Sequence, residues 1–207
     1  MNTLFITTDH RAKMEGMVSL NTSTECNPFC KEMQKNSEFV CSHCYAHQME
    51  RMYGKGLGYI AKYKANGEIL SSRNLTESEL GWLTVELGTR RIVRFHSFGE
   101  LLNMIHLNNF VRIATALPKT TFALWSKRID LIRKLKDKPK NLILIYSTPR
   151  LDDSTPYIPK GFDKVFSVYR KKVVEKNNIA VNCNSRCIDC QKCYTLKGPK
   201  QIREQMK

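Results

Sequence analysis

Two stretches, TTFALWS at residues 120–126 and NLILIYS at residues 141–147, decide the fold class of this chain. Both are apolar almost throughout and rich in β-branched or aromatic residues, which is typical of strands covered on both faces. The stretch between them contains RIDLIRKLKDK (128–138), which has the pattern of a helix. Strand, helix and strand in this order predict parallel strands joined by a crossover helix.

The same alternation extends in both directions along the chain. Further strands are expected at GMVSLNTS (16–23), RIVRFHS (91–97) and DKVFSVYR (163–170). Apolar residues at helical spacing in 99–118 predict a helix that ends at Pro118, and Thr76 with Glu79 forms the capping box of a helix of one or two turns. The predicted fold is therefore α/β, either a partial (β/α) barrel or an open parallel sheet.

The positive charge is concentrated in the second half. The 207 residues carry a net charge of +15, with 34 Lys and Arg against 19 Asp and Glu. Residues 1–118 hold 13 basic and 11 acidic side chains, which leaves 21 (34 − 13) and 8 (19 − 11) for residues 119–207. A basic half indicates a polyanionic partner such as nucleic acid or a host nucleic-acid-associated protein. The alternative is that these basic residues bind no partner and only keep the surface well solvated.

The sequence also bears on location. The longest apolar run, LILIY, has the length of a strand, and no segment approaches the roughly 20 apolar residues of a membrane helix. The first residues lack the charged-then-apolar layout of a signal peptide. We expect a cytoplasmic protein with no membrane partner.

Eight cysteines fall into two sets of four, which are Cys26, Cys30, Cys41 and Cys44, and Cys183, Cys187, Cys190 and Cys193. In a reducing compartment, clustered cysteines bind metal more often than they form disulfides. Four thiolates complete the shell of a zinc ion or of a [4Fe–4S] cluster. The spacing of the first set, C-x3-C-x10-C-x2-C, suits either metal. The second set, C-x3-C-x2-C-x2-C, is compressed in the manner of ferredoxin-type runs, which favours iron–sulfur.

The first set lies in a defined place in the expected fold. It follows the first strand of the parallel core, and HSFGEL (96–101) ends the next one. Because ligands bind at the carboxyl ends of parallel strands, both segments are expected on the functional edge of the sheet. Two separate metal sites are the simplest interpretation, and a mixed site with ligands from both sets stays open.

A cysteine loop after the first strand, ending in CxxCY, and a second strand ending in Gly-Glu resemble the radical S-adenosylmethionine (radical SAM) superfamily. The segments CSHCYA, VRFHSFGEL, FALWSKR, LIYST and CIDCQKCY more closely resemble a family of phage-encoded proteins labelled gene product 88, over about residues 18–200. The resemblance implies a truncated radical-SAM-like core, [4Fe–4S] clusters and a host-cell cytoplasmic location. It also implies S-adenosylmethionine as a ligand.

The resemblance and the strand ends together nominate cofactor-binding residues. They are His43, His96, Ser97, Gly99, Glu100, Lys127 and Arg128. His43 adjoins Cys44, Gly99 and Glu100 are placed to hold an amino group, and Lys127 and Arg128 can receive phosphate or carboxylate. The alternative involves no ligand. His43 is then an ordinary loop histidine, Gly99 forms a turn with Glu100 at the start of a helix, and Arg128 begins a basic helix.

Two functions follow from these observations. One is a radical-SAM-like iron–sulfur enzyme, with a core at residues 1–176 and a cluster-binding tail at residues 177–207. The other is a non-catalytic basic protein, stabilised by iron–sulfur or zinc, that binds nucleic acid or a host nucleic-acid machine. The usual radical SAM spacing is C-x3-C-x2-C, and four cysteines around one cluster would leave no iron open. The sequence therefore leaves enzymatic activity undecided.

Overall fold

The computed structural model describes residues 4–10, 12–53 and 58–206. Within them, one seven-stranded sheet has its strands in the order in which they occur along the chain. The first pair is antiparallel, and all later neighbours are parallel. The strands are β1 (Ile6–Thr8), β2 (Val18–Leu20), β3 (Ile92–Phe95), β4 (Thr121–Ser126), β5 (Leu142–Ser147), β6 (Lys164–Tyr169) and β7 (Gln201–Gln205). The α/β prediction is confirmed, and the sheet is open.

The predicted strands at the centre of the sheet are confirmed as well. All six residues of β5 are buried, as expected for a strand covered on both faces. In β4, Phe122 and Leu124 enter the main core, whereas Ala123 and Trp125 belong to a second core. Since successive side chains of a strand point to opposite faces, the sheet separates two apolar clusters.

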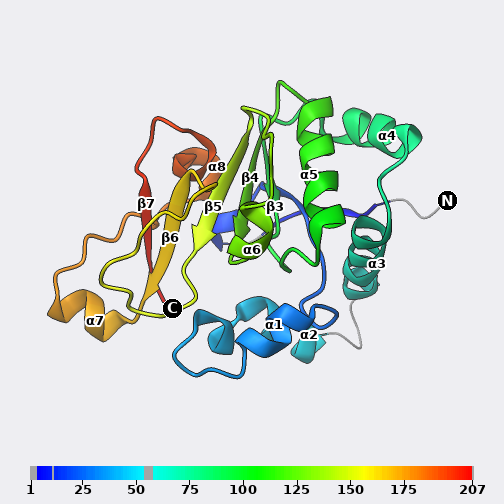
Figure 1. Cartoon of the computed structure of the whole chain (residues 1–207). Coiled ribbons are helices and arrows are strands. Elements are labelled where there is room, and N and C mark those ends of the chain that lie inside the picture. Colours follow the sequence, from blue (N-terminus) through cyan, green and yellow to red (C-terminus); the bar gives the residue numbers. More distant parts are fainter. Residues whose placement is uncertain (1–3, 11, 54–57, 207) are drawn as a thin grey trace.

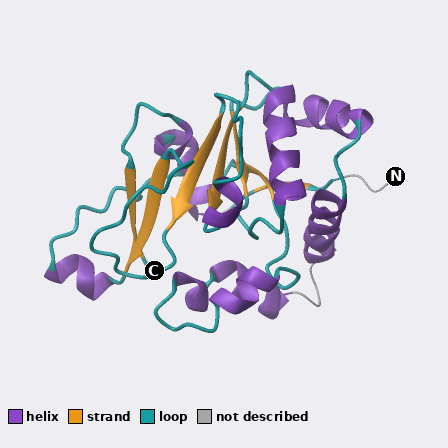
Figure 2. Ribbon diagram, viewed as in Figure 1, coloured by secondary structure: helices purple, strands orange, loops and turns teal. Residues whose placement is uncertain are grey.

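Helices cover the face of the sheet that holds the main core (Figures 1 and 2). They are α3 (Gly58–Ser72), α4 (Glu77–Leu87), α5 (Met104–Ala116) and the short α6 (Ile129–Ile132). Phe110 of α5 stacks on Phe95 of β3, with ring centroids 4.0 Å apart. Among the described residues, no helix has the length and apolar character needed to cross a membrane.

The C-terminal segment covers part of the opposite face. It contains α7 (Lys171–Lys176), α8 (Cys187–Cys190) and the 3-10 turn η3 (Lys192–Tyr194), and it ends in β7. Cys187, Ile188 and Cys193 pack in the second core with Trp125, beside the N-terminal 3-10 turn η1 (Ala12–Met14). This cysteine-rich segment is therefore built onto the sheet, to which it also contributes the last strand.

The first cysteine segment lies at the carboxyl edge of the parallel strands, below the sheet in Figure 1. It comprises α1 (Pro28–Met33), the 3-10 turn η2 (Val40–His43) and α2 (Tyr45–Tyr53). Asn27 caps α1 by accepting from the Phe29 amide, and its side-chain amide donates to the Glu100 carbonyl at 2.9 Å. This double role of Asn27 fixes the cysteine segment to the end of β3.

Two helices differ in length from the prediction. The capping box of Thr76 and Glu79 is present, but the helix behind it runs for 11 residues rather than one or two turns. The helix predicted at 128–138 stops at Ile132. Leu131 and Ile132 are its buried residues. The mostly charged stretch that follows, RKLKDK (133–138), leads to Pro139, which disfavours helix at the residue before it.

Candidate metal-binding sites

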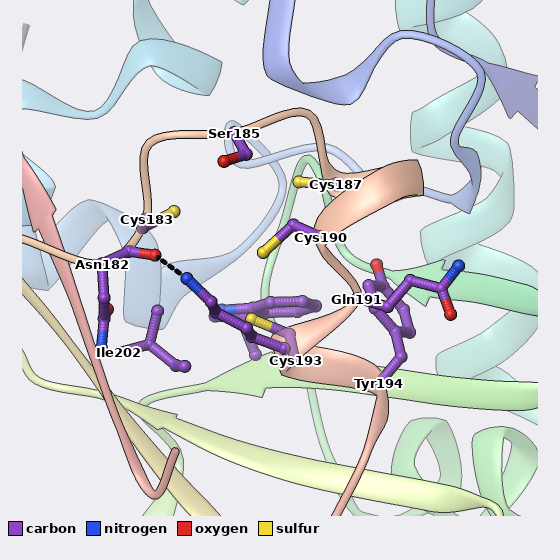
Figure 3. Close-up of a pocket in the computed structure, with 11 residues that line it drawn as sticks. Asn182, Cys183, Ser185, Cys187, Cys190, Gln191, Cys193, Tyr194 and Ile202 are labelled. Carbon is purple, nitrogen blue, oxygen red and sulfur yellow. Dashed lines mark hydrogen bonds between the residues drawn. The ribbon is translucent and has the colours of Figure 1, made fainter. Parts of the chain in front are cut away.

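The four C-terminal cysteines line a single pocket (Figure 3). Its other lining residues are Trp125, Asn182, Ser185, Gln191, Lys192, Tyr194 and Ile202. All eight cysteines of the chain are free thiols. Cys183, Cys187, Cys190 and Cys193 thus lie around one hollow, and their role as metal ligands stays a prediction.

Local structure explains this convergence. Gln191 adopts the left-handed conformation (φ 49°) between α8 and η3, which turns the chain back after Cys190 and lets Cys193 return to the pocket. Asn182 anchors the start of the segment to β7, since its side chain donates to the Gln201 carbonyl and accepts from the Arg203 amide. Sequence reasoning found the cysteines but not Asn182, whose position one residue before Cys183 gives no sign of this role.

The pocket favours the protonated form of Cys183, Cys187 and Cys193. Burial, together with neighbouring negative groups, raises the pKa of Cys183 to about 11 and that of Cys193 to about 12. Arg94 and Lys13 act in the opposite direction, and Lys13 lies 3.7 Å from the Cys183 sulfur. Thiols of this kind deprotonate when they bind a thiophilic metal, whose charge replaces that of the protons.

Two polar groups in the same pocket lack a partner. The indole nitrogen Nε1 of Trp125 and the hydroxyl of Tyr194 are buried and form no hydrogen bond with the described residues. Buried donors are nearly always satisfied, so each such group requires an explanation. Inorganic sulfide and ligating thiolate are hydrogen-bond acceptors that these donors can serve. The donor set therefore fits a sulfur-ligated metal group.

In the first set, Cys30, Cys41 and Cys44 share one environment. Burial raises the pKa of Cys30, and Glu100, Cys41 and Cys44 add to this rise. Burial alone would lower the pKa of Lys127, yet the negative charges of Cys41, Glu100 and Cys44 raise it. Lys127 therefore provides the positive charge beside these three thiols.

Cys26 stands apart from that environment. It is exposed, and the charged group that faces it is Lys64, which pairs with Glu25 at 3.0 Å. Neither cysteine set forms, within the described residues, a group of three or more ligands already placed to hold a metal ion.

Glu100 is buried and used within the fold. Its carboxylate accepts from the Ser126 hydroxyl (2.7 Å), the Lys127 amide (2.8 Å) and its neighbouring Leu101 amide (2.8 Å). It thereby joins the end of β3 to the end of β4. Gly99, at φ 98°, permits the close approach of Thr22, because a Cβ at position 99 would overlap the Thr22 side chain.

His96 faces the protein core. Its φ is 62°, it is 3% exposed, and neither ring nitrogen has a partner among the described residues. The ring instead contacts His106 and Phe110, each with a centroid distance of 5.0 Å. The sequence indicated His96 as a ligand contact but gave no reason to single out His106, which lies in an ordinary amphipathic helix.

The other nominated residues lie around the first cysteine set. The hydroxyls of Ser97 and Ser19 are 2.7 Å apart, and His43 is exposed on η2. Arg128 pairs with Asp130 and donates to the Leu101 carbonyl at 2.9 Å. Both nominated cations, Lys127 and Arg128, therefore bring positive charge toward Cys30.

Sequence reasoning also left Arg94 and Trp125 out of the C-terminal site. Trp125 lies near the end of β4, on the face covered by the C-terminal cysteines. The alternation of side chains along β4 indicates this face. Trp125 points to the same side of the sheet as Ala123 and to the opposite side from Phe122, Leu124 and Ser126.

Comparison with known proteins adds one match. A family model described as Gene product 88 matches residues 2–204, nearly the whole chain. Neither the curated proteins nor the solved structures include a match.

Proposed function

Since the chain belongs to the gene product 88 family, we propose that this member is an iron–sulfur protein, with one [4Fe–4S] cluster in each cysteine set. The observation that carries the proposal is the C-terminal pocket. Four thiols line it together with a buried indole N–H that has no partner among the described residues. Iron–sulfur clusters are held by cysteine thiolates and tuned by hydrogen bonds to their sulfurs.

At the C-terminal site, Cys183, Cys187, Cys190 and Cys193 would hold the group. Trp125 would donate to sulfur, and the positive charges of Arg94 and Lys13 would offset the negative charge of a cluster with four thiolates. The electrostatic influence of Arg94 on Cys187 and Cys193 supports this role. A fully ligated cluster in this position is suited to electron transfer or to a structural role.

At the N-terminal site, Cys30, Cys41 and Cys44 would be the ligands. The exposure of Cys26 and its separate environment favour a three-cysteine cluster, which leaves one iron free of protein sulfur. Such a cluster supplies, when bound, one-electron reduction of a ligand such as S-adenosylmethionine. Lys127 would stabilise the thiolates, and Asn27 would hold the cysteine segment on the end of β3.

A radical-SAM-like core is a more specific proposal than the presence of iron–sulfur clusters. The strands β2–β7 are parallel and follow sequence order, and the first cysteine set comes directly after the first of them. Sequential order with right-handed crossovers brings successive helices to one face, as in (β/α) barrels. This topology supports a partial barrel opened into a sheet.

The second candidate is a non-catalytic protein whose iron–sulfur or zinc sites stabilise the fold. The engagement of Glu100 favours it, since this carboxylate already accepts three hydrogen bonds inside the chain. In the enzyme, Glu100 would be the nominated contact for the amino group of S-adenosylmethionine. Its present partners would have to be released for that contact.

Anaerobic reconstitution with metal and sulfide analysis tests the proposal. We expect about eight iron and eight sulfide per chain, and about four of each in Cys30→Ser/Cys41→Ser and in Cys187→Ser/Cys193→Ser. Two zinc ions and no sulfide would overturn the iron–sulfur assignment. Formation of 5′-deoxyadenosine on addition of S-adenosylmethionine and dithionite would support the enzyme. Its absence from a fully loaded protein would favour the non-catalytic candidate.

A further inference from the structure

The amino-terminal edge of the sheet, opposite the edge where α1 and α2 lie (Figure 1), carries a row of basic side chains. A lysine or arginine stands within four positions before each parallel strand from β3 to β7. These residues are Arg90 and Arg91, Lys119, Lys140, Lys160, and Lys200. All are exposed. The parallel topology therefore gathers charges that are up to 110 positions (200 − 90) apart in the sequence.

Hydrogen bonds between neighbouring loops show that these positions adjoin one another. The Thr121 amide donates to the Arg91 carbonyl at 2.9 Å, and the Phe122 amide donates to the Asn141 carbonyl at 2.7 Å. At the other end of the row, the Val165 amide donates to the Lys200 carbonyl at 2.9 Å. Four strand spacings of about 4.8 Å separate β3 from β7 by roughly 19 Å across the sheet. The registers set the starts of β6 and β7 further along the strand direction than those of β3 to β5, so the row runs obliquely and exceeds this length.

The charges in this row are largely uncompensated. Among the described residues, the side chains of Arg90, Arg91, Lys119, Lys140 and Lys160 form no ion pair. The loop before β5 adds the exposed Lys134 and Lys136, and the loop before β7 adds the exposed Lys197.

The acidic side chains at this edge are few. Glu86 and Asp137 are exposed, and Asp163 is engaged by Lys138 at 3.1 Å and by the Leu144 amide. A surface of one sign is costly for a folded chain, because like charges repel one another. A polyanion with regularly spaced charges would relieve this repulsion.

We propose that the amino-terminal edge of the sheet, defined by Arg90, Arg91, Lys119, Lys140, Lys160 and Lys200, binds the phosphate backbone of a nucleic-acid duplex. A duplex presents one charge per about 1.7 Å along its axis, so a row that exceeds about 19 Å can contact several phosphates. Lysine and arginine contacts of this kind position the duplex and carry no sequence preference. The inference goes beyond the iron–sulfur proposal and does not depend on either cysteine set, because none of the six residues lines the C-terminal cysteine pocket or belongs to the first cysteine segment.

The test compares two triple variants with equal changes in charge. Lys119→Gln/Lys140→Gln/Lys160→Gln neutralises the edge, and Lys171→Gln/Lys172→Gln/Lys176→Gln neutralises three exposed lysines of α7, one of which pairs loosely with Glu175. Binding of a fluorescently labelled DNA duplex of about 20 base pairs is followed by anisotropy between about 50 and 200 mM salt. Iron and sulfide are measured on the same samples.

We expect the edge variant to bind about tenfold or more weakly and its salt slope to fall by about 2.7, which is 0.9 for each of three lost contacts. The α7 variant should change affinity less than about twofold, because it leaves the row intact. Equal losses in both variants, absence of duplex binding by the unaltered chain, or equally effective competition by polyglutamate would each overturn the proposal. Normal iron and sulfide content in the edge variant would show that its loss of duplex binding is not caused by loss of a cluster.

Discussion

The guanidinium of Arg94 lies 3.9 Å from the centre of the Trp125 ring. This pair joins β3 to β4 on the face where the C-terminal cysteines are held, and Trp125 lines their pocket. The stacking leaves the indole nitrogen free, and it also brings a fixed positive charge close to Cys187 and Cys193. A charge and an N–H donor beside a set of thiols are the two means by which a protein tunes a sulfur-ligated metal.

Trp125→Phe tests the role of the indole N–H. Phenylalanine keeps an aromatic face for Arg94 but removes the donor, and no hydrogen bond within the described residues is lost with it. We expect the reduction potential of the C-terminal cluster to fall by roughly 20–60 mV, which corresponds to one hydrogen bond of about 0.5–1.5 kcal/mol. Redox titration followed by electron paramagnetic resonance measures this shift. An unchanged potential would remove Trp125 from the site.

Cys26→Ser and Cys44→Ser differ in their expected effect on the N-terminal cluster. Cys44 shares the environment of Cys30 and Lys127, whereas Cys26 is exposed beside Lys64. We expect Cys26→Ser to retain about eight iron per chain and Cys44→Ser to retain about four. Iron analysis after anaerobic reconstitution distinguishes the two. A loss of about four iron in Cys26→Ser as well would mean that all four thiols are ligands, which leaves no open iron.

Glu100→Gln distinguishes a structural carboxylate from one reserved for a ligand. The carboxylate of Glu100 accepts bonds from Ser126 and from the Lys127 amide, and an amide side chain cannot accept all of them equally well. We expect the free energy of unfolding to fall by about 1–3 kcal/mol with no ligand present. Urea denaturation measures the change. Unaltered stability would mean that the buried carboxylate is held ready for a ligand.

Gly99→Ala should destabilise the carboxyl edge of β3. The added Cβ would overlap the Thr22 side chain and lie 2.7 Å from the Thr22 carbonyl oxygen, and position 99 has a φ of 98°. We expect a loss of about 2 kcal/mol or more in unfolding free energy. Gly81→Ala is the matched control, because Gly81 lies within α4 with no atom near its Cβ position, and alanine there should add about 0.5–1 kcal/mol. Equal losses in both variants would contradict this account.

The central strands of the sheet were predictable because they depend on apolar content. TTFALWS and NLILIYS become strands wherever their two faces are covered, so composition suffices to place them. β7 has only Ile202 buried, and its polar sequence QIREQ resembles a loop until β6 offers it hydrogen bonds. A strand at the edge of a sheet forms because it pairs with its neighbour, and the local sequence does not reveal that pairing.

The candidate sites were predictable to a different degree. Cysteine spacing identified all eight thiols, because a chemical type that is rare and clustered carries its own signal. The separate environment of Cys26 and the positions of Arg94 and Lys13 arise from contacts between distant segments. Lys13 lies 170 positions from the thiol that it approaches. Such contacts follow from the tertiary fold and not from local sequence.

His96 and His106 should make the stability of the fold depend on pH. Burial lowers the pKa of His106 to about 3, and burial together with His106 lowers that of His96 well below the ordinary value of 6.5. Both rings are therefore neutral in the folded chain, whereas the unfolded chain takes up protons below about pH 6.5. Their contribution to stability is complete above that pH and is lost as the pH falls toward the folded-state pKa values.

We expect the free energy of unfolding to fall by about 1.4 kcal/mol per pH unit for each histidine once the pH is well below 6.5. His96→Asn should remove about half of this slope, and asparagine tolerates the left-handed backbone of position 96. Urea denaturation at several pH values between about 7 and 5 measures both chains. An equal slope in the unaltered chain and in His96→Asn would show that His96 gains a proton within the fold, and its ring nitrogens would then need an acceptor.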